Sequence, residues 1–72
     1  MCGIIGIASN KPVSMNIINS LKKLEYRGYD SAGLATLDKD EISEKKCSGR
    51  VEELEKILFK TPSDGNLGMG HV

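Results

Sequence analysis

The segment at residues 24–33, "LEYRGYDSAG", lies where a helical pattern gives way to a strand pattern. Before it, apolar residues recur at the spacing of an amphipathic helix, at Ile17, Ile18, Leu21 and Leu24. Ser14 suits the N-cap of this helix. Gly28 can adopt the positive φ of a helix C-terminus, so we expect the helix to stop there. Residues 32–37, "AGLATL", are predicted to form the strand that follows.

Two further strands are predicted on either side of this unit. Residues 2–8, "CGIIGIA", have the composition of a buried strand and are followed by a turn at residues 9–12, "SNKP". Residues 38–40 are predicted to turn the chain. Residues 41–47 then favour a weak, exposed strand that pairs with its predecessor as a hairpin.

The C-terminal part of the sequence predicts one more helix and one more strand. The helix ends at Thr61-Pro62, and its apolar face comprises Val51, Leu54, Ile57 and Leu58. Residues 63–66 are predicted to be a loop, and residues 67–72, "LGMGHV", begin a strand. The expected order is roughly β-α-β-β-α-β, which indicates an α+β fold.

The charge and hydropathy of the chain exclude several kinds of partner. Lys+Arg and Asp+Glu both number 10, so the formal net charge is zero and no basic stripe for nucleic acid is predicted. The apolar runs are only a few residues long, whereas a membrane-spanning helix needs about 20 residues. The sequence has no secretory pattern, so we expect a cytoplasmic chain with neither a nucleic-acid nor a membrane partner.

The two cysteines, Cys2 and Cys47, do not make a disulfide framework, so reduced thiols are expected. A single histidine, His71, and no CxxC pair leave too few ligands for a closed zinc site, so no metal is predicted. A thiol-based redox function is disfavoured because no resolving cysteine stands near Cys2 in the sequence.

Cys2 becomes a candidate nucleophile if Met1 is removed, because the same residue would then carry both a thiol and a free α-amine. An α-amine has a pKa of about 8, against about 10.4 for lysine, so it can act as a general base near neutral pH. Gly3 would leave room for a substrate to approach the sulfur. The alternative is a small apolar cysteine at a strand start, without any function, and position alone does not decide between the two.

A resemblance favours the functional interpretation. "MCGIIGI" at residues 1–7, together with "LEYRGYDSAG", resembles the class II glutamine amidotransferases, a family of N-terminal-nucleophile hydrolases. Related amidotransferases keep the Arg-Gly and the Asp but usually carry other residues at Tyr26 and Tyr29. The resemblance therefore points to the hexosamine-forming branch rather than to amidophosphoribosyltransferase or asparagine synthetase, which we keep as the alternative.

The resemblance implies a mechanism and a domain organisation. Cys2 would attack the side-chain amide of glutamine, giving a thioester and ammonia, and water would then release glutamate. In the full enzyme a second domain would use the ammonia to convert fructose 6-phosphate to glucosamine 6-phosphate. The resemblance implies no cofactor. Residues 1–72 would form the N-terminal fragment of the amidotransferase domain, a truncated αββα layered fold without the sugar-phosphate isomerase domain.

Three residues between the predicted helix and strand are candidates for supporting the site. Arg27 and Asp30 flank Gly28 in a tight loop, and their charge-assisted hydrogen bonds could brace the nucleophile strand. The plainer alternative is a glycine-capped turn with a surface ion pair, which would contribute at most about 1 kcal/mol.

The remaining polar residues are given structural interpretations. Lys45 and Lys46 would lower the pKa of Cys47 slightly, although that cysteine is expected to be structural. His71 is interpreted as a structural histidine on a strand. The solvated face of the second helix is predicted to comprise Glu52, Glu53, Glu55 and Lys56.

The sequence ends inside an apolar run, so we expect truncation. The family's carboxylate-binding arginine and oxyanion-hole residues would follow Val72. The chain alone is therefore expected to be inactive: an inert remnant, or one half of a split enzyme whose downstream chain is separate. We also expect the first and last strands to be open edges beside an uncovered apolar face, so that the isolated chain is poorly folded or self-associated.

Overall fold

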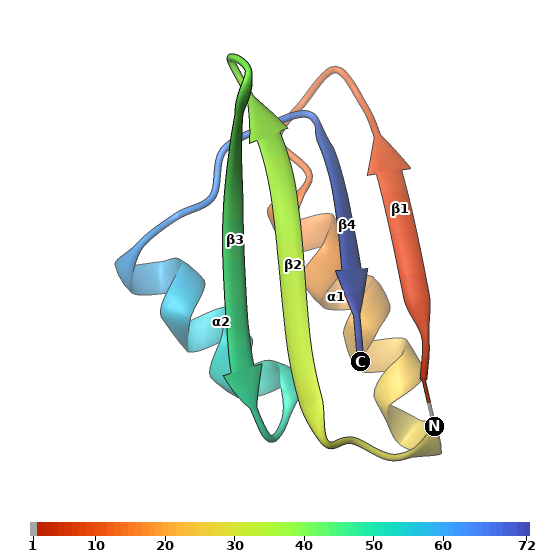
Figure 1. Ribbon diagram of the computed structural model, residues 1–72. Coiled ribbons are helices and arrows are strands. Elements are labelled where there is room, and N and C mark those ends of the chain that lie inside the picture. Colours follow the sequence, from red (N-terminus) through yellow and green to blue (C-terminus); the bar gives the residue numbers. More distant parts are fainter. Residues whose placement is uncertain (1) are drawn as a thin grey trace.

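The computed structural model describes residues 2–72, which form one sheet and two α-helices (Figure 1). In chain order the elements are β1 (Ile4–Ala8), α1 (Ser14–Leu24), the 3₁₀-helix η1 (Glu25–Arg27), β2 (Ser31–Asp38), β3 (Glu41–Ser48), α2 (Val51–Lys60) and β4 (Leu67–His71). The α+β class is confirmed. The short 3₁₀-helix was not predicted from the sequence.

All four strands belong to one antiparallel sheet with the order β1-β4-β2-β3. The last strand, β4, lies between β1 and β2, with His71 opposite both Ile4 and Gly33. The expectation that the first and last strands form the two edges is therefore wrong for the last one, because β4 is internal and β3 is the second edge. A long-range pairing of this kind leaves no local signal in the sequence.

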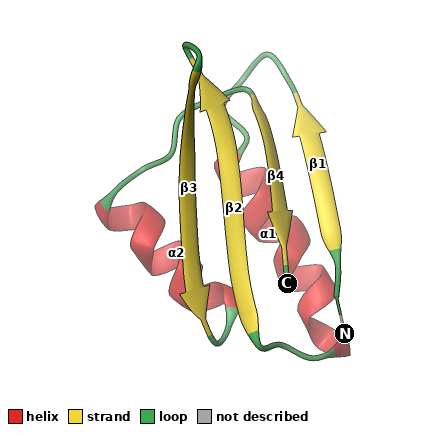
Figure 2. Cartoon of the chain, viewed as in Figure 1, coloured by secondary structure: helices red, strands yellow, loops and turns green. Residues whose placement is uncertain are grey.

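Both helices cover the same face of the sheet, so the described chain has two layers (Figure 2). Alternation along β2 turns Ala32, Leu34 and Thr36 toward the helices, where all three are buried. The buried apolar core comprises Val13, Ile17, Ile18, Leu21, Ala32, Leu34, Val51, Leu54, Leu58 and Val72. Neither helix of the described chain lies on the opposite face of the sheet (Figure 2).

The termini of the first helix, α1, differ from the predictions by a few residues. Ser14 is the first residue of α1, and the N-cap is the fully buried Val13, which makes no side-chain cap. The amide of Val13 instead donates to the carbonyl of Gly65 at 3.0 Å. The α-helix stops at Leu24, and the 3₁₀-helix continues the chain to Gly28, whose φ of 125° requires a residue without a side chain.

The predicted hairpin between β2 and β3 is confirmed, with register pairs from Ser31–Ser48 to Asp38–Glu41. Its turn residues Lys39 and Asp40 both have positive φ, of 51° and 67°. Positive φ at both central residues is the geometry that matches the twist of a two-residue hairpin.

The second helix, α2, begins at Val51 and ends before Thr61, as expected.

Candidate functional site

Cys2 lies at one end of the sheet, two residues before the start of β1, and is exposed. The next residue, Gly3, extends the sheet by exchanging two backbone hydrogen bonds with Val72, of 3.1 and 3.0 Å. The start of β1, the end of β4 and the start of β2 meet at this end (Figure 1). The predicted removal of Met1 falls on a residue outside the described ones.

Gly3 has a different role from the one expected. A Cβ atom at this position would lie 2.9 Å from Cδ1 of Leu24. The space that the missing side chain leaves is therefore filled by the last residue of α1, and it is not open to a substrate. The glycine allows the end of α1 to pack directly against the backbone next to Cys2.

Arg27, at the end of η1, and Asp30, in the loop that follows, were expected to brace the nucleophile strand, with a surface ion pair as the plainer alternative. In the part of the chain that the structure describes, no salt bridge joins Arg27 to Asp30. Arg27 instead donates from Nε to the hydroxyl of Tyr26 at 3.0 Å and lies over that ring. The backbone carbonyl of Asp30 accepts a hydrogen bond from the amide of Gly49 at 2.8 Å. These contacts attach the loop to its neighbours without a direct side-chain bond to β1.

A contact between distant parts of the sequence fixes the same loop. One carboxylate oxygen of Glu25 accepts a hydrogen bond from the amide of Val51 at 2.8 Å, at the start of α2. Arg50 lies 3.9 Å from that oxygen and stacks over the ring of Tyr29, 4.7 Å from its centroid. Sequence reasoning missed Glu25 and Arg50, because no periodicity or motif links residues so far apart.

His71 occupies the face of the sheet that lacks helices. A Cβ atom on Gly33 would lie 2.7 Å from Nε2 of His71, so the imidazole leans across β2 and away from β1. His71 lines two hollows: one of about 100 Å³, shared with Lys46 and Met69, and a more open one of about 300 Å³, shared with Ser31 and Ser48. The strand position of His71 is as predicted, and its packing over Gly33 fits a structural role.

The expected pKa shift of Cys47 is wrong in direction. Burial raises the pKa of this thiol; a hydrogen bond with the backbone of Ala32 lowers it, and the charge of Glu53 raises it. Successive strand residues point to opposite faces, so Lys46 lies away from the sulfur and pairs with Glu44 at 3.7 Å. Lys45 donates to Ser43 at 3.2 Å. Neither lysine lowers the pKa of Cys47.

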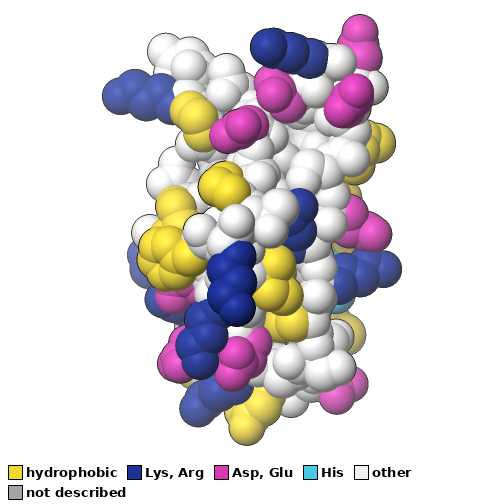
Figure 3. Space-filling model, turned by 90° about the vertical axis from the view of Figure 1, so that its left-hand side faces the viewer, with side chains coloured by type: hydrophobic (Ala, Val, Ile, Leu, Met, Phe, Trp, Pro, Cys, Tyr) yellow, Lys and Arg dark blue, Asp and Glu magenta, His cyan; other side chains and the backbone are white. Residues whose placement is uncertain are grey.

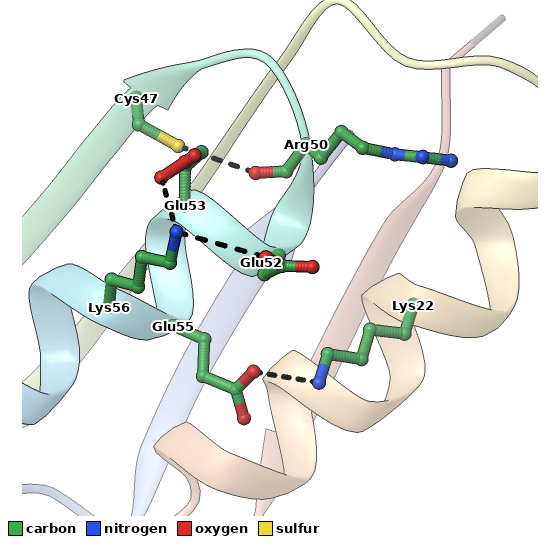
Figure 4. A network of polar contacts seen from close by, with 7 residues as sticks. All are labelled: Lys22, Cys47, Arg50, Glu52, Glu53, Glu55 and Lys56. Carbon is green, nitrogen blue, oxygen red and sulfur yellow. Dashed lines mark hydrogen bonds and ion pairs between the residues drawn. The ribbon is translucent and has the colours of Figure 1, made fainter.

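Most of the predicted solvated face of α2 is confirmed, with one exception. Glu52 and Glu53 are exposed and pair with Lys56 (Figure 4). Glu55, in contrast, has a side chain only 19% exposed, and it binds Lys22 of α1 at 2.7 Å (Figure 4). This ion pair joins the two helices.

One face of the surface (Figure 3) and the side-chain clusters of residues 2–72 bear on the expected absence of other sites. The face of α2 and β3 carries acidic and basic side chains, with hydrophobic ones between them (Figure 3). Among residues 2–72, no group of three or more His, Cys, Asp or Glu side chains is placed to hold a metal ion. No helix in the described chain is long and apolar enough to cross a membrane.

Comparison with known proteins gives matches along the whole chain. No protein-family model matches it. Curated relatives are 49% identical in Clostridium acetobutylicum, 48% in Bradyrhizobium diazoefficiens and 46% in Mesorhizobium japonicum, each over all 72 residues. The chain spans 12% of the length of each of these relatives.

By this similarity the chain is homologous to a segment of the glutamine-dependent aminotransferases. More specifically, it is a homologue of glutamine–fructose-6-phosphate aminotransferase (isomerizing), the name that all three relatives carry. The 12% coverage is consistent with an N-terminal fragment of that enzyme.

Proposed function

We propose that the chain supplies the nucleophile of a glutamine amidotransferase domain. After Met1 is removed, the Cys2 thiol attacks the side-chain amide carbon of glutamine, and its proton passes by way of the α-amine to the departing ammonia. Water then attacks the thioester, releasing glutamate and restoring the thiol. In the whole enzyme the ammonia would aminate fructose 6-phosphate and yield glucosamine 6-phosphate.

The observation that carries this proposal is the exposed position of Cys2 beside a fixed backbone pair. A nucleophile must be accessible and must project from a well-ordered segment. The names of the relatives support glutamine and fructose 6-phosphate as the substrates of the full enzyme, in preference to the substrates of amidophosphoribosyltransferase. The reaction needs a reduced thiol, which fits a cytoplasmic location.

We assign a supporting role to the loop of Arg27, Gly28 and Asp30. Gly28 supplies the positive φ with which the loop turns into β2, and the carbonyl of Asp30 attaches the loop to Gly49. The stacked Arg27 guanidinium is not engaged in an ion pair within the described chain and is exposed. The loop then braces the site by backbone contacts more than by charge.

The complete domain would have an αββα arrangement, in which a second sheet packs on the face without helices. Large apolar side chains on this face are exposed, namely Ile4, Leu37, Ile42, Leu67 and Met69. Sheets pack face to face about 10 Å apart through such side chains. The chain would thus be one part of the domain, completed by downstream residues on the same chain or on a separate one.

The test is complementation in a split enzyme. The chain is co-expressed with the remainder of the Clostridium acetobutylicum relative, and glutamate release from glutamine is measured; the relative's own matching segment is the positive control. We expect activity with the chain and a loss of about 10⁴-fold or more in Cys2→Ala. Cys47→Ala is the matched control and should remain active.

Two results would contradict the proposal. Activity that survives in Cys2→Ala would exclude this cysteine as the nucleophile. If the relative's segment restored activity and this chain did not, the chain would be the inert remnant of such an enzyme.

A further inference from the structure

Glu25 caps a helix to which it does not belong. It is the first residue of η1, its side chain is only 15% exposed, and it accepts a hydrogen bond from the amide of Val51 at 2.8 Å. The N-cap residue of α2, Arg50, makes no side-chain cap. The first amides of a helix have no partner within it and favour a negative charge. Glu25 provides both the acceptor and the charge.

Arg50 contacts both the Glu25 carboxylate and the loop that follows η1. Its guanidinium is 3.9 Å from the Glu25 carboxylate and stacks on Tyr29, 4.7 Å from the ring centroid. The neighbouring amide of Gly49 donates to the carbonyl of Asp30 at 2.8 Å. Glu25 of η1, together with Tyr29 and Asp30 of the loop that follows, therefore holds this part of the chain against the start of α2 at three points.

A short path leads from Glu25 to Cys2. Leu24 directly precedes Glu25, and its Cδ1 lies against the backbone of Gly3, where a Cβ would be 2.9 Å away. Gly3 is fixed on its other side by the two hydrogen bonds with Val72. A shift of η1 would move Leu24 and so release the backbone adjacent to the nucleophile.

We propose that Glu25 is a positioning residue for Cys2, acting through Leu24 and Gly3, with Arg50 as its partner. This role rests on the proposed function of Cys2, but its test does not need glutamine. The test distinguishes Glu25 from a residue that only stabilises the fold. Loss of the Glu25 side chain should weaken the protection of the Gly3–Val72 pair more than that of the rest of the sheet.

A matched control is present on the neighbouring turn of α1. Lys22 and Glu55 also join α1 to α2, at 2.7 Å, and Glu55 is nearly as buried as Glu25, at 19% (Figure 4). Glu55 accepts no backbone hydrogen bond among those that the described residues form. Its loss therefore removes an interhelical ion pair of similar burial without removing a cap.

The experiment is amide hydrogen exchange, read residue by residue by fragmentation mass spectrometry, on the chain assembled with the remainder of the relative. It compares the wild type with Glu25→Ala, Glu25→Gln and Glu55→Ala. Exchange at Val51, Gly3 and Val72 is divided by exchange in the β2–β3 ladder, which removes any global change in stability. In Glu25→Ala we expect all three ratios to rise about fivefold or more, as for a lost helix cap. Glu25→Gln keeps an acceptor oxygen and should recover most of the protection, and Glu55→Ala should leave the ratios unchanged.

Three results would overturn the proposal. The first is faster exchange at Val51 alone in Glu25→Ala, which would mean a cap without positioning. The second is an equal rise at Gly3 and Val72 in Glu55→Ala. The third is a wild-type chain whose Gly3 and Val72 amides exchange at free-chain rates. A failed complementation assay with the expected exchange pattern would instead count against the proposed function.

Discussion

At the scale of single residues, the two thiols of the chain differ in their surroundings. Cys2 is exposed at the end of the sheet, whereas Cys47 is half-buried, and its Sγ lies 3.8 Å from the carbonyl oxygen of Arg50 (Figure 4). The position of Cys2 could be inferred from its place in the sequence. The environment of Cys47 could not, because it depends on how α2 packs against β3 and brings Glu53 near the sulfur.

The raised pKa of Cys47 makes a prediction about pH. The folded state holds the thiol proton more tightly than the unfolded state does. The contribution of Cys47 to the free energy of unfolding is therefore fully present below the unfolded-state pKa and is lost as the pH rises through the folded-state pKa. In Cys2→Ser, alkylation of Cys47 by iodoacetamide should show its midpoint above the value of about 8.5 for a free cysteine.

Glu53→Gln should lower this midpoint, because the charge of Glu53 contributes to the raised pKa. Glu52→Gln is the control, because Glu52 is the adjacent exposed glutamate and also pairs with Lys56. It should change the midpoint of Cys47 less. Alkylation followed by mass spectrometry at several pH values measures both midpoints. If the pH midpoint for alkylation of Cys47 in Cys2→Ser, without a change at Glu53, lay below that of a free cysteine, the raised pKa of Cys47 would be contradicted.

At the scale of elements, the sequence predicted the strands and helices well but their junctions less well. The two strands of the hairpin lie within one residue of their predicted bounds, and α2 begins at the first residue of its predicted apolar face, because turn residues and apolar periodicity are local signals. The N-cap of α1 was misassigned because Val13 is held by tertiary contacts, through Gly65. The cap of α2 comes from Glu25, which no local pattern could indicate.

The packing of α1 on β4 depends on a glycine. A Cβ on Gly70 would lie 2.5 Å from Cγ2 of Ile17 and 3.1 Å from Cδ1 of Leu21. We expect Gly70→Ala to lower the free energy of unfolding by about 1–3 kcal/mol, as overpacking does. Gly6→Ala is the control, since a Cβ there would meet only the carbonyl of Gly68 at 3.9 Å. Equal urea midpoints for the two variants would show that the helix does not sit this close.

At the scale of the whole molecule, the sheet is covered on one face only. The sequence indicated two helices and four strands, but not that β4 inserts between β1 and β2, because that pairing joins segments about sixty residues apart in the chain. Because both helices cover the same face (Figure 2), the other face presents exposed apolar side chains from several strands, among them Ile42, Leu67 and Met69.

The open face predicts self-association of the isolated chain. Exposed contiguous apolar surface favours association with another surface. Met69→Lys, at the middle of the open face, should lower the sedimentation-average mass of the chain at a given concentration. Phe59→Lys, which replaces an exposed apolar residue of α2, should not. A wild-type chain that sediments as a monomer and unfolds cooperatively would contradict this expectation.

The most direct test of the central claim is the mass of the chain in the complemented enzyme, measured after treatment with an electrophilic glutamine analogue. We predict a chain that lacks Met1 and carries a single adduct on Cys2, while Cys47 remains unmodified. A chain that retains Met1 and still supports normal glutamine hydrolysis would contradict the account.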